Sequence, residues 1–223
     1  MIALRRYPVK SMGGEALDLA RLDERGVVGD RWYAVEDKAG RFASGKETRR
    51  FRRRDAVFEF AANTEIDGRV IVSHGDERWY VGDPELDQRL SVKMGTTVRV
   101  AAEVEVPHQD MGAVSIVGSA TLQWCADRWG GSADPRRLRV NIVVDSDQPF
   151  VEERWAEVQL GKATVRVVAR VPRCRMLDIR QDGVDPGENW LKPLAQERDM
   201  CLGVYADVVL PGDVVVGDDA RCF

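Results

Sequence analysis

The stretch at residues 139–174, RVNIVVDSDQPFVEERWAEVQLGKATVRVVARVPRC, decides the fold class. It contains three short runs rich in β-branched residues, at 139–145, 156–161 and 163–171. Aspartate, glycine and proline separate these runs, and short apolar runs between turn residues are typical of strands rather than helices. The stretch therefore predicts consecutive β-strands, the last of which ends just before Cys174.

The same pattern continues on both sides. Residues 31–44, RWYAVEDKAGRFAS, predict two strands joined by a D-K-A-G turn, and residues 69–83, RVIVSHGDERWYVGD, predict a second hairpin with an H-G-D-E turn. Two helices have explicit boundary signals. One runs over 84–94 between Asp83 and Gly95, and the other over 120–129 with Ser119 as its N-cap. The chain is thus predicted to be mainly β, with a few short helices.

Composition and charge narrow the functional classes. The 223 residues are 44% hydrophobic and 31% charged, which is typical of a globular protein with one large or two small domains. No run approaches the ~20 apolar residues of a membrane span, and the N-terminus lacks the apolar core of a secretory signal. We therefore expect a cytoplasmic protein without membrane contact. The net charge of −4 makes a nucleic-acid partner unlikely, because phosphate contacts require a basic surface.

The four cysteines form no C-x-x-C pair, and the two histidines lie in unrelated stretches. This distribution argues against a conventional zinc or iron–sulfur site. Cys174 differs from the other cysteines because Arg173 and Arg175 flank it, and neighbouring positive charge stabilises a thiolate. It is a candidate nucleophile or soft-metal ligand, with a buried structural thiol as the alternative.

Several short motifs offer donors to an anion. Lys10 and Ser11 follow a strand, Arg31 begins a hairpin, and the start of the helix near Ser119 and Thr121 presents free backbone N–H groups. Arg139 and Asn141 alternate with apolar residues and are predicted to share one face of a strand. Taken alone, the Lys10–Ser11 loop, Arg31 and the helix start are better explained by a solvated loop, a surface ion pair and ordinary capping.

Taken in order, YPVKS, GDRWYAVEDKAGRFASGK, the capped helix, the stretch from 139 to 187 and GVYADVVLPGDVVVGD resemble the MOSC family with its N-terminal β-barrel domain. The resemblance covers nearly the whole chain. Its most specific part is R-x-N-I, F-x-E-x-x-W, L-G and R-C at family spacing. It implies a β-barrel assembly divided into an N-terminal β-domain at 1–88 and a MOSC domain at 89–223.

The resemblance also implies a molybdenum cofactor, molybdenum bound to molybdopterin, with Cys174 as the metal ligand. By position, the other residues expected to hold this cofactor are Lys10, Ser11, Arg31, Ser119, Thr121, Arg139, Asn141 and Arg173. The chain departs from the amidoxime-reducing members in two places. Val171 stands where many of them have a first cysteine, and Asp178 stands where they have a hydroxyl residue. We therefore expect Cys174, Arg173 and Asp178 to form the catalytic set.

The activity implied by this resemblance is oxygen-atom transfer that reduces N-hydroxylated or N-oxide small molecules. The sequence contains no cysteine cluster, haem motif or G-x-G-x-x-G, so electrons are expected from a separate electron-transfer protein. The arginine-rich segment 49–54 could steer an acidic partner of this kind, and a solvated edge strand is the alternative.

Two other functions stay open. In the first, Cys174 carries sulfur as a persulfide in molybdenum-cofactor maturation or metal–sulfur assembly. In the second, the chain is a non-enzymatic module that binds RNA through residues 49–54. The second is less favoured because the net charge is negative and no aromatic-studded sheet motif accompanies the arginines.

Overall fold

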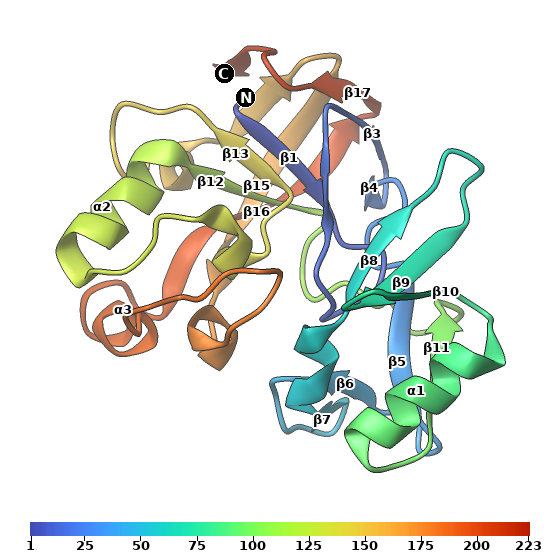
Figure 1. Ribbon diagram of the computed structural model, residues 1–223. Helices are drawn as coiled ribbons and strands as arrows, with labels where there is room; N and C mark the ends of the chain where they lie inside the picture. Colours follow the sequence, from blue (N-terminus) through green and yellow to red (C-terminus); the bar gives the residue numbers. More distant parts are fainter.

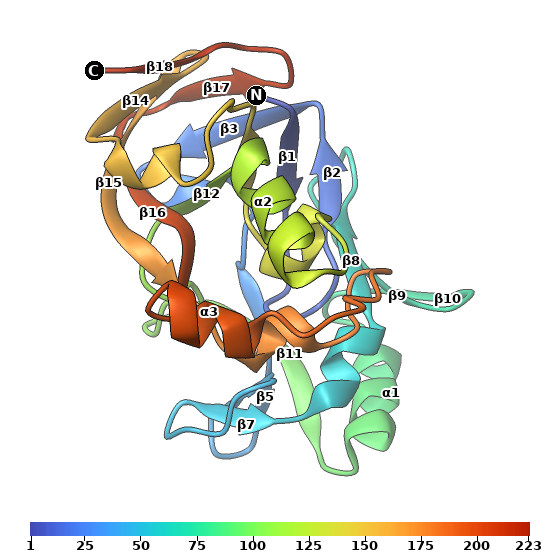
Figure 2. The same cartoon turned by 90° about the vertical axis from the view of Figure 1, so that its left-hand side faces the viewer.

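The computed structural model describes residues 1–223, and its largest element is an open, mixed sheet of eight strands. Its strands, in sheet order, are β18 (Ala220–Cys222), β14 (Glu157–Leu160), β15 (Ala163–Pro172), β16 (Cys201–Leu210), β12 (Val114–Gly118), β13 (Ile142–Val144), β1 (Ala3–Arg6) and β2 (Glu15–Leu17). Only β12 and β13 pair in parallel. The sheet combines strands from both ends of the chain, and both termini lie at the same end of the molecule, at the top of Figure 1 and Figure 2.

Both faces of this sheet are covered. On one face, Val114, Ile116 and Ile142 pack against the small sheet formed by β17 (Gly212–Val215), β3 (Leu19–Asp23) and β4 (Gly26–Val27). On the other face, Val117 and Val143 pack against residues of α2 (Ser119–Trp129) and α3 (Leu191–Glu197). Figure 2 shows the position of these two helices. Successive residues of β12 and β13 therefore serve opposite faces, which explains their unbroken apolar runs.

Residues 33–102 form a second lobe with its own core. Its four-stranded sheet contains β11 (Val98–Ala102), β5 (Tyr33–Asp37), β6 (Phe42–Ser44) and β7 (Phe51–Arg53), and its three-stranded sheet contains β10 (Glu77–Tyr80), β9 (Val70–His74) and β8 (Ala61–Thr64). The helix α1 (Pro84–Met94) packs Leu86 and Leu90 into this core. We call the remainder, built around the eight-stranded sheet, the first lobe (Figure 1). None of the helices is long and apolar enough to cross a membrane.

The prediction of a mainly β fold with a few short helices is confirmed, as are both hairpins. The capping signals of α1 are confirmed in detail. The Asp83 side chain accepts from the Glu85 N–H, and Gly95 ends the helix in the left-handed conformation with φ of 64°. The division into residues 1–88 and 89–223 stays a prediction.

Two local predictions are wrong. The N-cap of α2 is Gly118 rather than Ser119, whose hydroxyl donates to Asp145 instead of capping the helix. The strand predicted at 139–145 covers only Ile142–Val144. Arg139 has a left-handed backbone with φ of 55° and ends the 3-10 helix η2 (Pro135–Leu138), so it cannot share a strand face with Asn141.

Candidate functional site

A cavity that is partly open to solvent is lined by residues of both lobes. Ser44 and Lys46 come from the second lobe, and most of the remaining lining comes from the first. Seven residues predicted from the sequence line it together: Lys10, Ser11, Arg31, Arg139, Asn141, Arg173 and Cys174. The fold thus brings residues from the first and last of the predicted motifs into one cavity.

The connection from β1 to β2 places Lys10 and Ser11 at the boundary between the lobes. Val9 and Met12, on either side of them, pack into the core of the second lobe. Ser11, Arg31 and Arg139 all have positive φ angles, of 71°, 55° and 55°. This conformation is unfavourable for residues other than glycine and recurs at binding sites that the surrounding structure holds in place. Three separate sharp turns therefore present side chains to one cavity.

The cavity is strongly cationic. Six of its 20 lining residues are lysine or arginine, and Asp110 is its one acidic residue. The buried Lys10 ammonium donates to the His108 carbonyl at 2.6 Å and to Asp110 at 3.0 Å. Burial lowers the pKa of Lys10 to about 8, although Asp110 acts in the opposite direction. Such a concentration of buried positive charge favours a bound anion.

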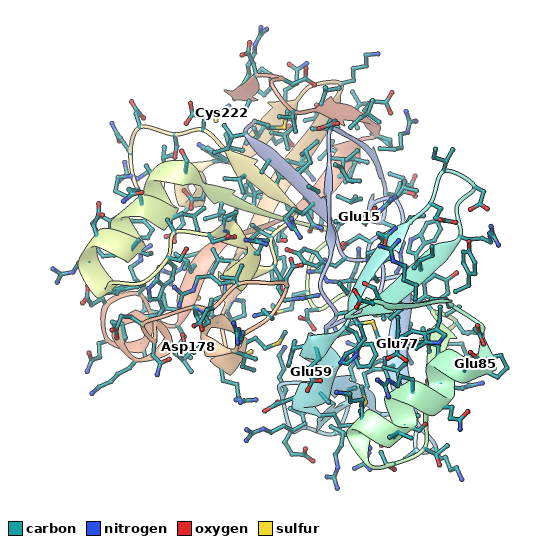
Figure 3. All side chains as sticks on the ribbon, viewed as in Figure 1. Glu15, Glu59, Glu77, Glu85, Asp178 and Cys222 are labelled. Atoms are coloured by element: carbon teal, nitrogen blue, oxygen red, sulfur yellow. The ribbon has the colours of Figure 1, made fainter.

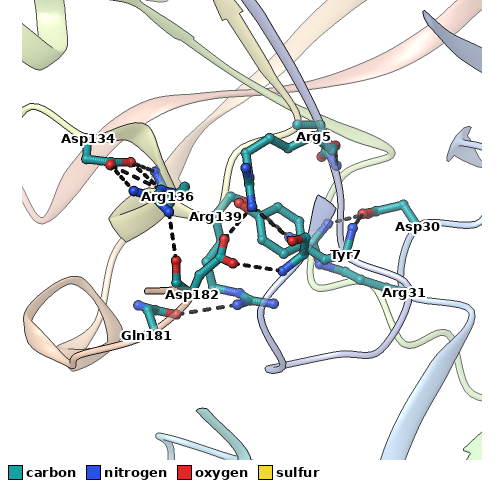
Figure 4. A network of polar contacts seen from close by, with 11 residues as sticks. Arg5, Tyr7, Asp30, Arg31, Asp134, Arg136, Arg139, Gln181 and Asp182 are labelled. Atoms are coloured by element: carbon teal, nitrogen blue, oxygen red, sulfur yellow. Dashed lines mark hydrogen bonds and ion pairs between the residues drawn. The ribbon is translucent and has the colours of Figure 1, made fainter. Parts of the chain in front are cut away.

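Arg139 lies between an aromatic ring and a single side-chain amide, as Figure 4 shows. Its guanidinium carbon is 4.3 Å from the centre of the Tyr7 ring, and Nη1 donates to Gln181 Oε1 at 3.4 Å. Nη2 has no hydrogen-bond partner, and burial lowers the pKa of Arg139 to about 10. A buried, unsatisfied charged donor is costly, so an anion at Nη2 would be stabilising.

Arg173 repeats this arrangement next to Cys174. Its Nε and Nη1 each donate to a backbone carbonyl at 2.7 Å, those of Leu202 and Leu138, while Nη2 has no partner. Burial lowers the pKa of Arg173 to about 10. The two backbone hydrogen bonds fix the guanidinium and leave one N–H group for a ligand.

Cys174 follows β15 directly and is the N-cap of the 3-10 helix η4 (Arg175–Asp178). Its side chain is partly buried and lines the cavity. The two flanking arginines differ, because Arg175 points to Asp55 at 2.8 Å and to the Gly45 carbonyl at 3.2 Å. Of the two arginines that flank Cys174, only Arg173 therefore lines the cavity beside the thiol. By contrast, Cys125 is fully buried on α2, where burial raises the pKa of its thiol to about 12.

The start of α2 does not reach the cavity, contrary to the expectation for Ser119 and Thr121. The buried Thr121 hydroxyl donates to the carboxylate of Glu152 at 3.0 Å and accepts from the Phe150 N–H. The Ala120 N–H donates to the Ser146 hydroxyl at 3.2 Å. The Glu152 carboxyl group, whose pKa is raised by burial, therefore takes the place at this helix N-terminus where the sequence predicts a phosphate.

Asp178 also lies outside the cavity lining. Its carboxylate accepts from the Trp190 N–H at 2.8 Å and the Leu191 N–H at 3.2 Å, at the start of α3. It is the last residue of η4, and Figure 3 labels it at that short 3-10 helix. Its contact with the buried Arg137, at 3.6 Å, is an ion pair that fixes the loop. These contacts explain Asp178 as a structural residue rather than as part of a catalytic set.

Sequence reasoning missed several lining residues, among them Lys46, Asp110, Ser115, Arg137 and Tyr205. Tyr205 lies on β16, and burial raises the pKa of its phenol. Ser115 and Asn141 are hydrogen-bonded to each other: the Ser115 hydroxyl donates to Asn141 Oδ1 at 2.9 Å. Apart from the G-K pair that ends in Lys46, no local signal marks these residues.

The donor set fits a ligand that has both a phosphate group and a thiolate-bound metal. The free Nη2 atoms of Arg139 and Arg173 suit phosphate oxygens, and Cys174 suits a soft metal. No group of three or more His, Cys, Asp or Glu side chains in the chain could hold a metal ion.

Comparisons with known proteins identify the family of the chain. The MOSC domain model matches residues 103–221, and the model of the MOSC N-terminal beta barrel domain matches residues 1–128. Mitochondrial amidoxime reducing component 2 of Bos taurus is 23% identical over 268 residues, covering 95% of this chain and 80% of its own. Molybdenum cofactor sulfurase of Danio rerio is 28% identical over 72 residues, covering 31% of this chain and 9% of its own.

Two solved structures are similar at low identity. The YuaD protein from Bacillus subtilis has a TM-score of 0.48 at 12% identity and covers 98% of this chain and 91% of its own. YiiM from Escherichia coli has a TM-score of 0.45 at 13% identity and covers 100% of this chain and 70% of its own. The two family models, each of which matches more than half of the residues, carry the assignment. The chain belongs to the MOSC family.

Proposed function

We propose that this protein binds molybdenum–molybdopterin in the cavity, with Cys174 as the metal ligand, and reduces N-hydroxylated or N-oxide small molecules. One observation carries this proposal: two guanidinium groups with buried, unpartnered Nη2 atoms and a partly buried thiol line the same cavity. The similarity to an amidoxime reducing component supports the reaction class, and the similarity to molybdenum cofactor sulfurases supports the cofactor.

In this proposal the basic residues bind the anionic end of the cofactor. Arg139 and Arg173 donate through Nη2 to phosphate oxygens, and Lys10 adds a point charge. Arg31 is held for the same task by its ion pair with the buried Asp30 and by its donation to the Arg139 carbonyl at 3.1 Å. The thiolate of Cys174 then anchors the other end of the cofactor.

When bound, the cofactor supplies two-electron redox chemistry with oxygen-atom transfer. Reduction of an N–OH group to N–H consumes two electrons and two protons and releases water. A separate electron-transfer protein supplies the electrons. Two groups of the chain can hold a proton in the cavity, the Lys10 ammonium at Nζ and the Tyr205 phenol at Oη.

The arginine-rich segment gives less support to a docking role than its sequence indicated. Arg52 pairs with Glu47, Arg53 with Asp55 at 3.1 Å and Arg54 with Asp37 at 3.0 Å. β7, which contains the first two, is an edge strand. Most of the charge is thus neutralised locally, so we place neither the electron donor nor RNA on this segment.

Activity with an artificial donor tests the proposal. The protein is produced in a host that makes molybdenum cofactor and incubated with reduced methyl viologen and an N-hydroxylated amidine. We expect turnover by the wild type and none by Cys174→Ser, with Cys222→Ser as the matched control because Cys222 is exposed and outside the cavity. No turnover, but sulfane sulfur on Cys174 after incubation with a cysteine desulfurase, would favour the sulfur-carrier function instead.

A further inference from the structure

The connection between β11 and β12, residues 103–113, runs along the cavity, and three of its residues line it: Gln109, Asp110 and Gly112. We call it the crossing segment. It is attached at several points, since the Glu103 N–H donates to the Trp32 carbonyl at 2.8 Å and Gln109 Nε2 donates to the Arg25 carbonyl at 2.8 Å. The buried His108 ring packs edge-on against Phe42.

The Asp110 side chain bridges two ammonium groups. Oδ1 is 3.0 Å from Lys10 Nζ, and Oδ2 is 3.6 Å from Lys46 Nζ. Both ammonium groups also lie 5.2 Å from the centre of the Phe51 ring. Two lysines from different lobes therefore share one carboxylate against an aromatic face. This geometry is that of an anion-binding site in which the anion belongs to the protein.

Asp110 is well suited to leave this position. Its side chain is 37% exposed, whereas that of Lys10 is 7% exposed. The ammonium groups hold the pKa of Asp110 well below its usual range, although burial acts to raise it, so the carboxylate stays charged. A ligand anion that entered beside it would meet like charge and find both lysines engaged. Binding of that anion at the lysines therefore requires the carboxylate to move.

We propose that Asp110 occupies an anion subsite between Lys10 and Lys46, and that a phosphate group of the ligand displaces it together with the crossing segment. The subsite lies in the same cavity as the free Nη2 atoms of Arg139 and Arg173, so the two lysines and these two arginines bind the same phosphate group. The identity of the ligand rests on the proposed function, whereas the competition between Asp110 and an external anion does not. Binding of an anion in the cavity thereby changes the position of the crossing segment.

Sulfate binding to the purified full chain, measured by calorimetry at constant ionic strength, tests the competition. We expect Asp110→Asn to bind sulfate up to about fivefold more tightly than the wild type, because a partly exposed ion pair worth up to ~1 kcal/mol no longer competes. Glu105→Gln is the matched control, since Glu105 lies on the same segment, is exposed and forms no ion pair, and it should leave the affinity unchanged. Equal or weaker binding by Asp110→Asn, or no binding by either protein, would overturn the proposal.

Hydrogen exchange of the crossing segment separates displacement from a purely electrostatic effect. Sulfate should accelerate amide exchange at 103–113 in the wild type, whereas Asp110→Asn should exchange rapidly with or without sulfate. Slower exchange in sulfate-bound wild type would show that the segment closes on the anion, and the proposal would fail. An absence of molybdenum in the protein would refute the proposed function and leave both of these results unaffected.

Discussion

Replacing Arg139 by methionine should weaken anion binding by the cavity without destabilising the protein. The burial of Arg139 and its contact with Tyr7 make opposing contributions to the free energy of unfolding. Burial lowers the pKa of Arg139 from 12.5 to about 10, which corresponds to about 3 kcal/mol against the charged form. The contact with the Tyr7 ring, at 4.3 Å, offsets about 1–2 kcal/mol of this burial cost. Methionine retains the apolar stem and removes the charge, so the free energy of unfolding should stay equal or rise by up to ~2 kcal/mol.

Anion affinity should change in the opposite direction. Nη2 of Arg139 has no partner within the chain, so a bound anion gains a charge-assisted hydrogen bond worth about 1.5–3 kcal/mol. Its loss in Arg139→Met should weaken sulfate binding about 10- to 100-fold. A structural arginine would show the reverse combination, a loss of stability with unchanged affinity.

Calorimetry with sulfate and urea unfolding of the same preparations measure both quantities. Arg139→Lys should bind with intermediate affinity, because it keeps the charge and loses the planar fork. Arg166→Met is the matched control, since Arg166 is exposed and pairs with Glu157 on the neighbouring strand, and it should bind sulfate as the wild type does. The reasoning is refuted if Arg139→Met retains wild-type sulfate affinity, or if it lowers the free energy of unfolding by more than ~2 kcal/mol.

Three further predictions concern pH, stability and the helix start. Sulfate affinity should be constant below about pH 7 and fall as the pH rises through about 8, because the Lys10 ammonium loses its proton there, and calorimetry on Lys10→Met should show a flat profile over this range. Trp190→Ala should lower the free energy of unfolding by about 3–5 kcal/mol in urea titrations. Trp190 is fully buried, donates to the Gly130 carbonyl at 2.7 Å and lies against the Arg137 guanidinium at 3.6 Å. A loss below ~1 kcal/mol would contradict this packing. Thr121→Val should leave sulfate affinity unchanged and cost about 1–3 kcal/mol of stability, because it removes the hydroxyl that donates to Glu152. Weaker sulfate binding by that variant would restore the start of α2 as an anion site.

The parts of the fold that the sequence predicted correctly depend on short-range signals. Asp83, Pro84 and Gly95 determine α1 because an N-cap, a fixed φ and a left-handed C-cap act within the helix itself. Both hairpins follow from turn residues between β-branched runs. These signals need no information from the rest of the chain.

The predictions that failed depend on distant partners. Glu152, 31 residues away, accepts from Thr121 and removes the start of α2 from the list of anion sites. Asp178 binds the start of α3, 12 and 13 residues further along. The left-handed backbone of Arg139 replaces a strand position, and it aims the side chain into the cavity by a route that residue periodicity cannot reveal. Local sequence patterns identified the candidate donors, and only the tertiary structure shows which of them line the cavity.

The convergence of Lys10 and Arg139 has a single topological cause. β1 lies beside β13 in the large sheet, so the segment after β1 meets the segment before β13. Lys10 and Arg139 are thereby brought together from opposite halves of the sequence. The order of the motifs along the chain could suggest this meeting by resemblance, but spacing alone could not.

Molybdenum and pterin content is the most direct test of the central claim. The wild type, Cys174→Ala and Cys222→Ala are purified from a host that makes molybdenum cofactor, and metal and pterin are measured per chain. The account predicts that wild type and Cys222→Ala contain molybdenum and pterin in equal, near-stoichiometric amounts and that Cys174→Ala contains little or no molybdenum. Wild type without molybdenum, or Cys174→Ala with the full amount, would contradict the assignment of Cys174 as the metal ligand.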